Sequence, residues 1–144
     1  MKSTSKICRR PQGVAVDGTH IYFTNLDSFP GTIARADLDG QNVNLSFITG
    51  TSDPRGLAVD GSHVYWTDVG TDTIGRADLD GQNVNNSFIT GANAPLAVAA
   101  DGSHVYWTNL GNPHTIGRAD LDGQNVNQSF ITGSSYGAVA VDPE

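Results

Sequence analysis

Short apolar runs alternate with turn residues along the whole chain, and no helical period interrupts them. Residues 54–94 contain four strand-like runs, at 56–59, 63–67, 73–77 and 86–90. Asp-Gly at 60–61 and at 80–81 predicts tight hairpin turns, because Asp and Gly tolerate the positive φ of primed turns. The first two runs are almost continuously apolar, which indicates strands covered on both faces. We therefore expect this segment to form a four-stranded antiparallel sheet.

The same pattern occurs three times. RADLDGQNV begins at residues 35, 76 and 118, and SFITG follows each copy in the same phase. A period of 41 to 42 residues with four strands per unit is typical of a propeller blade. The predicted fold is an all-β propeller with three four-stranded blades and one extra inner strand. The units are a basic N-terminal segment in the phase of an outer strand, three blades and a fourth inner strand: residues 1–10, 11–53, 54–94, 95–136 and 137–144.

Residues 65–68 read YWTD, and IGRA and LDG follow at 74–77 and 79–81. These strings resemble the YWTD repeats of the low-density lipoprotein receptor class B type, and the resemblance extends over residues 11–142. It implies a six-bladed propeller, usually extracellular, that binds proteins. The first copy reads YFTN and the third YWTN, so the resemblance implies no role that needs the aspartate in every blade.

Three blades leave two apolar blade faces uncovered, and exposed faces of this kind mark an interface. With about 60° per blade, three blades span half of a six-bladed ring. We therefore expect the chain to partner itself as a homodimer that completes the ring. The inner strand expected at residues 139–141 is redundant in such a ring. It could replace the partner's residues 14–16, lie outside the ring, or show that the chain is a fragment of a longer array.

Charge and hydropathy narrow the choice of partners. The formal charge is −7, and four of the eight basic residues stand in the first ten positions, so a nucleic-acid partner is not expected. No apolar run is long enough to span a membrane. Residues 1–11 lack the apolar core of a secretory signal, whereas the resembled family is usually extracellular, so the localisation stays open. The single cysteine rules out an intrachain disulfide.

Comparing the three copies separates constant turns from variable connections. The connections between second and third strands differ, as do those between successive blades, and both sets fall on one face of a propeller. Loops on a rigid scaffold commonly carry binding residues, although sequence drift also collects where packing is slack. We predict a protein-binding site on this face, with these contributors: Asp27, Phe29, Asp53, Arg55, Asp72, Asn112, His114 and Tyr136.

Candidate metal ligands repeat with the blades but do not converge. His20, His63 and His104 each begin the second strand of a different blade, which favours a structural role over a shared zinc site. The aspartates of RADLDG suggest calcium, but the sole glutamate is Glu144, so turn capping and pairing of Asp78 with a neighbouring arginine are favoured. Three Asn-X-Ser sequons are interpreted as turn residues. No metal or cofactor is predicted.

Three function classes compete. The first is a non-catalytic module that self-assembles and binds a protein. The second is an enzyme similar to the lactonase or lyase propellers, which needs a general base and carboxylates converging near the axis. The inner strands instead carry Val, Ala, Leu and Gly, so no catalytic residue is predicted. The third is a lectin, which would need an exposed aromatic residue in each copy. An engineered scaffold or fragment without a ligand is a further alternative.

Overall fold

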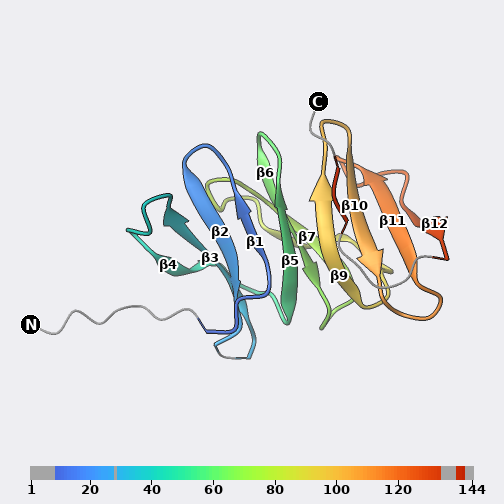
Figure 1. The fold of residues 1–144 in the computed structure, drawn as a ribbon, viewed down its shortest axis with the longest axis horizontal. Coiled ribbons are helices and arrows are strands. Elements are labelled where there is room, and N and C mark those ends of the chain that lie inside the picture. Colours follow the sequence, from blue (N-terminus) through green and yellow to red (C-terminus); the bar gives the residue numbers. More distant parts are fainter. Residues whose placement is uncertain (1–8, 28, 134–138, 142–144) are drawn as a thin grey trace, which may run out of the picture.

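The computed structural model describes residues 9–27, 29–133 and 139–141, and these contain twelve strands and no helix (Figure 1). The first sheet consists of β1 (Val14–Val16), β2 (His20–Asn25), β3 (Thr32–Asp37) and β4 (Asn44–Ile48). The second consists of β5 (Pro54–Val59), β6 (His63–Asp68), β7 (Thr73–Asp78) and β8 (Asn85–Ile89). The third consists of β9 (Pro95–Ala100), β10 (His104–Asn109), β11 (Thr115–Asp120) and β12 (Asn127–Thr132). No segment of the described chain is a helix able to cross a membrane.

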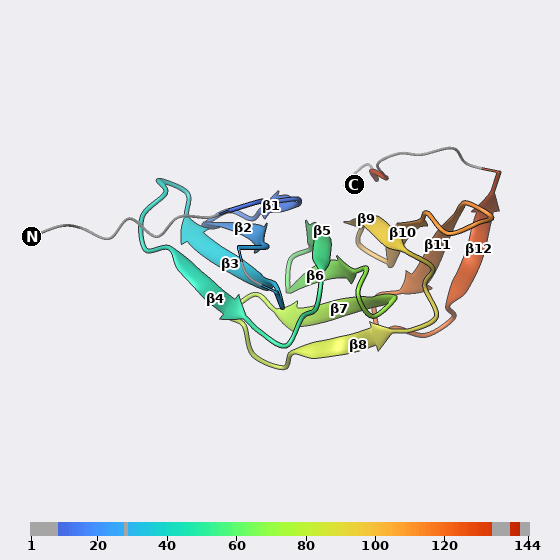
Figure 2. The same cartoon turned by 90° about the horizontal axis from the view of Figure 1, so that it is seen from below.

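Each sheet is built from four consecutive strands that pair antiparallel in chain order. Figure 2 shows the three sheets side by side in an open arc, with β1, β5 and β9 on the concave side and β4, β8 and β12 on the outside. This arrangement confirms the predicted all-β propeller blades. The inner strands approach closely, since a Cβ at Gly56 would collide with the backbone of β9 at Leu96. Small residues are therefore needed near the axis, as the sequence indicates.

The core lies between neighbouring sheets. We call the contact between the first and second sheets the first junction, and that between the second and third sheets the second junction. The first junction buries Tyr22, Ile33 and Ile48 of the first sheet against Leu57, Val64, Trp66 and Ala77 of the second. The second junction repeats this arrangement with Tyr65, Ile74 and Ile89 against Val98, Val105, Trp107 and Ala119. Neighbouring blades thus bury apolar side chains of both sheets against each other.

The tryptophan of each motif is matched to a glycine on the neighbouring strand. Trp66 is fully buried and stands opposite Gly75 in the register of β6 and β7. A Cβ at Gly75 would fall inside the Trp66 indole. In the first blade the motif reads Phe23, and the opposite residue is Ala34. The smaller ring therefore coincides with the larger opposing residue, which gives a packing reason for the departure from YWTD.

The turn between the first two strands of each blade is closed by an aspartate side chain. Asp60 accepts hydrogen bonds from the amides of Ser62 and His63 at 2.7 Å and from the Tyr65 hydroxyl at 2.8 Å. Neither Asp60 nor Gly61 has a positive φ, so the primed turn predicted there is wrong. The side chain substitutes for the special backbone geometry, as in an Asx turn. Gly81 does have φ +85°, but within a longer connection that also contains Asn83 at φ +53°.

The equivalent contacts shift the pKa values of Asp17 and Tyr22. Desolvation opposes ionisation of Asp17, but hydrogen bonds from the Thr19 amide, the Tyr22 hydroxyl and the His20 amide lower its pKa to about 2. Burial, followed by the bond to the Asp17 carboxylate, raises the pKa of Tyr22 to about 12. The pair is therefore held as carboxylate and neutral phenol across the whole ordinary pH range.

Near the ends of the chain, the sequence places residues 1–10 in the phase of an outer strand and predicts an inner strand in residues 137–144. Arg9 and Arg10 belong to no strand, although the Arg9 carbonyl accepts a hydrogen bond from the Leu26 amide at 3.3 Å. Residues 1–8 lie outside the described residues. Residues 139–141 are described and form no strand in the single chain. The rest of the predicted fourth inner strand lies outside the described residues, so its pairing stays a prediction.

Candidate binding face

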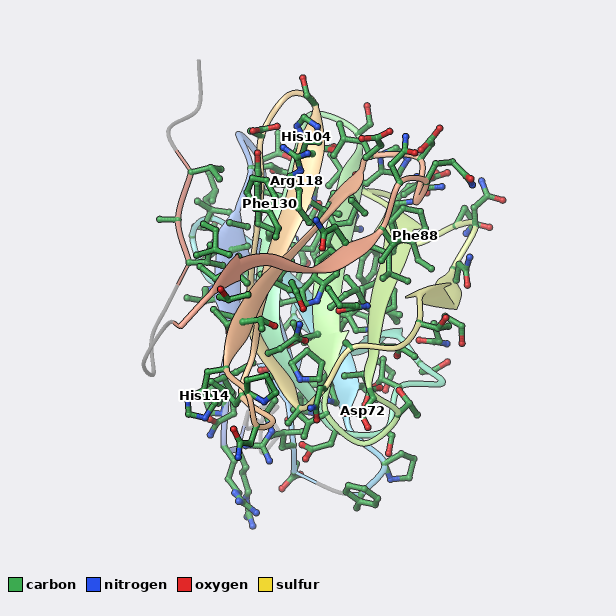
Figure 3. The ribbon with its side chains drawn as sticks, turned by 90° about the vertical axis from the view of Figure 1, so that its right-hand side faces the viewer. Asp72, Phe88, His104, His114, Arg118 and Phe130 are labelled. Carbon is green, nitrogen blue, oxygen red and sulfur yellow. The ribbon has the colours of Figure 1, made fainter. Side chains whose placement is uncertain are left out.

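The variable connections gather at one end of the blades. Figure 3 shows Asp72 and His114 at this end and His104 at the opposite end. The connections β2–β3, β6–β7 and β10–β11 alternate here with the segments that join successive blades. We call this end the variable-loop face. Because the strands fix the loop bases, differences in loop sequence alter this surface without altering the core.

A hollow of about 250 Å³ lies on the variable-loop face between the first two blades. Arg55 Nη2 lies 2.8 Å from Asp53 Oδ2, and Arg9 Nε lies 3.5 Å from Asp27 Oδ1. Phe29 is 76% exposed, so it presents an apolar surface beside these charges. The hollow therefore combines apolar contact area with charges of both signs. It is lined by Arg10, Leu26, Asp27, Phe29, Asp53 and Arg55.

Backbone contacts hold the two loops of this hollow together. The Gly31 amide donates to the Ser52 carbonyl at 2.9 Å, and the Thr51 hydroxyl donates to the Gly31 carbonyl at 2.6 Å. Thr51 is 3% exposed, so both bonds are shielded from water. These buried hydrogen bonds therefore tie together the two loops that line the hollow.

The last residue of the YWTD motif also organises this face. Asp68 is 1% exposed, and its carboxylate accepts hydrogen bonds from the amides of Ser52 at 2.7 Å, Asp53 at 2.9 Å and Gly70 at 3.0 Å. Asn109 takes the same place in the third blade, where its Oδ1 accepts from the Asn93 amide at 3.0 Å. An oxygen acceptor is the shared requirement, so asparagine can replace aspartate. Sequence reasoning did not single out Asp68, although its position in the motif was a signal.

The remaining predicted contributors lie elsewhere. Asp72 accepts a hydrogen bond from the Ala94 amide at 2.9 Å through Oδ1, and from the Ala92 amide at 3.2 Å through its carbonyl. It therefore supports the connection to the third blade. Asn112 and His114 belong to the β10–β11 connection of that blade. Tyr136 lies outside the described residues.

The histidines pair within their own blades. His20, His63 and His104 each place Nε2 3.5–3.7 Å from an aspartate Oδ1 on the third strand of the same blade. Asp78 thus lies beside His63 and accepts a hydrogen bond from the side-chain Nδ2 of Asn83 at 2.8 Å, so the predicted pairing with a neighbouring arginine is wrong. Within the described ranges no three His, Cys, Asp or Glu side chains form a group able to hold a metal ion.

Comparisons with known proteins agree with this architecture. Residues 62–101 match the family model for the low-density lipoprotein receptor repeat class B, which confirms the resemblance carried by the YWTD string. A solved nidogen/laminin complex contains a chain 26% identical to this one, with a TM-score of 0.73 over 81% of this chain and 46% of that chain. No curated protein sequence gave a significant match. The chain is a β-propeller repeat protein.

Two enzyme structures share the fold. A Xanthomonas campestris gluconolactonase is 18% identical, with a TM-score of 0.64, and covers 81% of this chain and 46% of its own. A virginiamycin B lyase from Staphylococcus aureus is 23% identical, with a TM-score of 0.62, over 81% of this chain and 40% of that chain. A likeness at these identities shows the fold alone. The present chain spans less than half the length of each of these three propeller chains.

Proposed function

We propose that the chain is a non-catalytic propeller module that completes its ring with a second copy and binds a protein through the variable-loop face. The observation that carries self-assembly is the unequal exposure of equivalent isoleucines. Ile48 and Ile89 are 1% exposed within the junctions, whereas Ile131 on the third blade is 48% exposed. An apolar side chain at this position is buried wherever a following blade is present.

The first blade also exposes an apolar residue whose counterparts in the other two blades are buried. Val14 is 67% exposed, while its counterparts Leu57 and Val98 are 8% and 7% exposed. A shallow apolar depression of about 390 Å³ marks the same place, where a preceding blade would pack, and it is lined by Pro11, Gln12, Gly13, Val14, Ile21 and Phe23. The exposed apolar face of the first blade is thus the kind of surface that packs against the exposed apolar face of the third blade.

A second copy supplies both missing faces at once. Two three-blade arcs related by a two-fold axis give six blades, in keeping with a chain that spans 46% of the nidogen-complex propeller chain. Two blade-on-blade contacts of this kind are expected to bury more than about 2,000 Å², which is in the range of obligate dimers. The apolar character of both edges supports such an obligate contact.

The edge variants Ile131→Asp and Val14→Asp test this assembly by light scattering. Each variant places a charge in both of the contacts that join the two copies in the proposed dimer. The measured mass is therefore expected to fall from twice the 15.1 kDa chain mass to the mass of the monomer. Val84→Asp is the matched control, because Val84 is 41% exposed and lies away from both edges. Dimeric Ile131→Asp and Val14→Asp proteins would overturn the proposed contact.

Partner binding rests on Phe29, whose exposed side chain lines the hollow together with Arg55 and Asp53. Exposed aromatics next to a fixed arginine are typical anchors of protein interfaces. Selection from a displayed random-peptide library is expected to enrich peptides that bind the wild type and the Val84→Asp control but lose affinity for Phe29→Ser. Enriched peptides that bind Phe29→Ser equally well would refute this site.

The enzyme alternative follows from the gluconolactonase and lyase structures, which share the fold at low identity. Such chemistry requires carboxylates and a base near the axis, whereas the axis-facing strands carry small and apolar residues such as Gly56 and Ala58. A lactone-hydrolysis assay across added divalent metals is expected to give no turnover. Turnover that depends on a metal would favour the alternative.

A further inference from the structure

Outside its apolar core, each junction contains an arginine that stacks on a phenylalanine of its own blade and donates a hydrogen bond to a backbone carbonyl of the next blade. We call this arginine–phenylalanine pair the clasp. In the first junction the Arg35 guanidinium carbon lies 4.3 Å from the centre of the Phe47 ring. Arg35 Nη1 donates to the Leu79 carbonyl at 3.2 Å, and the Tyr22 hydroxyl oxygen, whose proton goes to Asp17, lies 3.3 Å from the same carbonyl oxygen. A stacked arginine of one blade therefore holds the turn after the third strand of the next blade.

The second junction repeats the clasp. Arg76 stacks over Phe88 at 4.3 Å and donates to the Leu121 carbonyl at 2.8 Å. The phenylalanine rings also press on the held turn: a Cβ at Gly81 would lie 2.9 Å from Phe47, and one at Gly123 would lie 2.9 Å from Phe88. Only a glycine lets the turn approach the ring so closely. The clasp thus recognises a Leu-Asp-Gly turn by both its carbonyl and its missing side chain.

The third blade carries a clasp that no described turn fills. The Arg118 guanidinium carbon lies 4.1 Å from the centre of the Phe130 ring, and Tyr106 contacts that ring. Figure 3 shows Arg118 and Phe130 close together on the side of the molecule that ends the arc. Phe130 is 38% exposed, and among the described residues no backbone carbonyl is found to accept a hydrogen bond from Arg118. The arginine–phenylalanine stack is therefore already formed without the turn.

The first blade carries the one Leu-Asp-Gly turn that no clasp holds. Leu38 is 51% exposed, whereas its counterparts Leu79 and Leu121 are partly buried against the junction cores. A Cβ at Gly40 would meet no atom within 4 Å, in contrast to Gly81. Gly40 nevertheless keeps φ +81°, the geometry of the two held turns. The turn is thus presented in the shape that the clasp accepts.

We infer that Arg118 and Phe130 of one copy hold the 38–40 turn of a second copy, which makes the contact head-to-tail. This inference rests on the proposed ring and extends it by naming the recognition element and its direction. The two internal junctions provide the template, since they join the same residue types in the same order. Residues 139–141 align with an inner strand and carry no such turn.

The guanidinium is the specific part of this contact. A hydrogen bond from a charged donor to a carbonyl, combined with stacking on an aromatic ring, changes affinity by about tenfold or more when removed. Because a two-copy ring contains two such junctions, Arg118→Ala is expected to raise the dimer dissociation constant by about 100-fold. Arg118→Lys keeps the charge but loses the planar fork, so it is expected to restore only part of this loss.

Mixing two defective variants tests both the residues and the direction. Phe130→Asn removes the ring on which Arg118 stacks, at the exposed face of the third blade. Leu38→Asn changes the turn that this pair would hold, at the exposed face of the first blade. Each alone damages both junctions of its own dimer, so sedimentation velocity is expected to show monomers at concentrations where the wild type is dimeric. A one-to-one mixture retains one intact junction, formed by the clasp of Leu38→Asn and the turn of Phe130→Asn, and is expected to form dimers. Val84→Asn, changed on an exposed site away from the edges, is expected to behave as wild type.

The outcomes separate this inference from the proposed ring. A dimeric wild type whose Phe130→Asn and Leu38→Asn variants also dimerise would overturn the clasp and leave the ring intact. Folded variants, checked by circular dichroism, that stay monomeric after mixing would overturn the head-to-tail direction. A monomeric wild type would overturn the proposed ring itself. A wild type that forms open chains would overturn the two-copy ring, while dimers in the mixture would still support the clasp.

Discussion

Replacing Gly75 with alanine tests the packing between strands that positions every blade face. The added Cβ would fall inside the Trp66 indole, which is fully buried. Overpacking of this kind costs about 1–3 kcal/mol. Removing a strand glycine returns about 0.5–1 kcal/mol. We expect a net loss of about 1 kcal/mol, within a range of about 0–2.5 kcal/mol, in the free energy of unfolding.

The first blade suggests how to rescue this loss. There Phe23 stands opposite Ala34, so the double variant Trp66→Phe/Gly75→Ala installs a pair that the chain already uses. Trp66→Phe alone is expected to cost about 1–3 kcal/mol through the space that it leaves. The double variant is expected to lose at least about 1 kcal/mol less than the sum of the single losses, as for residues in direct contact.

Urea unfolding at one fixed protein concentration measures these differences, since assembly contributes to apparent stability. Gly61→Ala serves as the control, because a Cβ at Gly61 meets no atom within 4 Å and its φ is not positive. This control is expected to change the free energy of unfolding by less than about 0.5 kcal/mol. Additive losses in the double variant would refute the matched-pair reasoning.

Three further predictions concern polar contacts. Asp68→Ala is expected to cost about 2–3 kcal/mol in urea unfolding because it leaves three amides without their acceptor, whereas Asp68→Asn, the residue type at 109, is expected to cost less than half as much. The Asp17 pKa is lowered in the fold to about 2, so its stabilisation is complete above about pH 4 and is lost as the pH falls towards 2; Asp17→Asn is expected to flatten that part of the pH–stability curve. Arg76→Ala is expected to lower Tm without changing the dimer dissociation constant, since its clasp is internal.

Much of the fold could be predicted because the repeat fixes the phase of every strand. The predicted strand at 63–67 differs from β6 by one residue at its end, since alternating turns leave little freedom. The turn at 60–61 was predicted wrongly because Asp60 closes it with its side chain, which the Asp-Gly pair alone does not reveal. A dipeptide indicates the preferred backbone conformation of a turn. It does not indicate which atoms accept hydrogen bonds from the amides of that turn.

The candidate site was less predictable. Variation between copies indicated the loop face, but the hollow depends on how neighbouring blades bring Phe29 and Arg55 together, which no local pattern encodes. The clasp could not be predicted from the sequence either, because it also depends on how neighbouring blades are placed. Arg76 and Phe88 lie in repeated strings, yet their shared partner, the Leu121 carbonyl, belongs to the next blade. Contacts between repeats follow from the twist and spacing of the blades and not from the order of residues.

Sedimentation equilibrium of the unaltered chain over a hundredfold range of concentration tests the central claim most directly. The account predicts a single assembled species at twice the 15.1 kDa chain mass, because two head-to-tail junctions close a ring and leave no free edge. A mass that stays at 15.1 kDa throughout the range, or one that keeps rising with concentration, would contradict it.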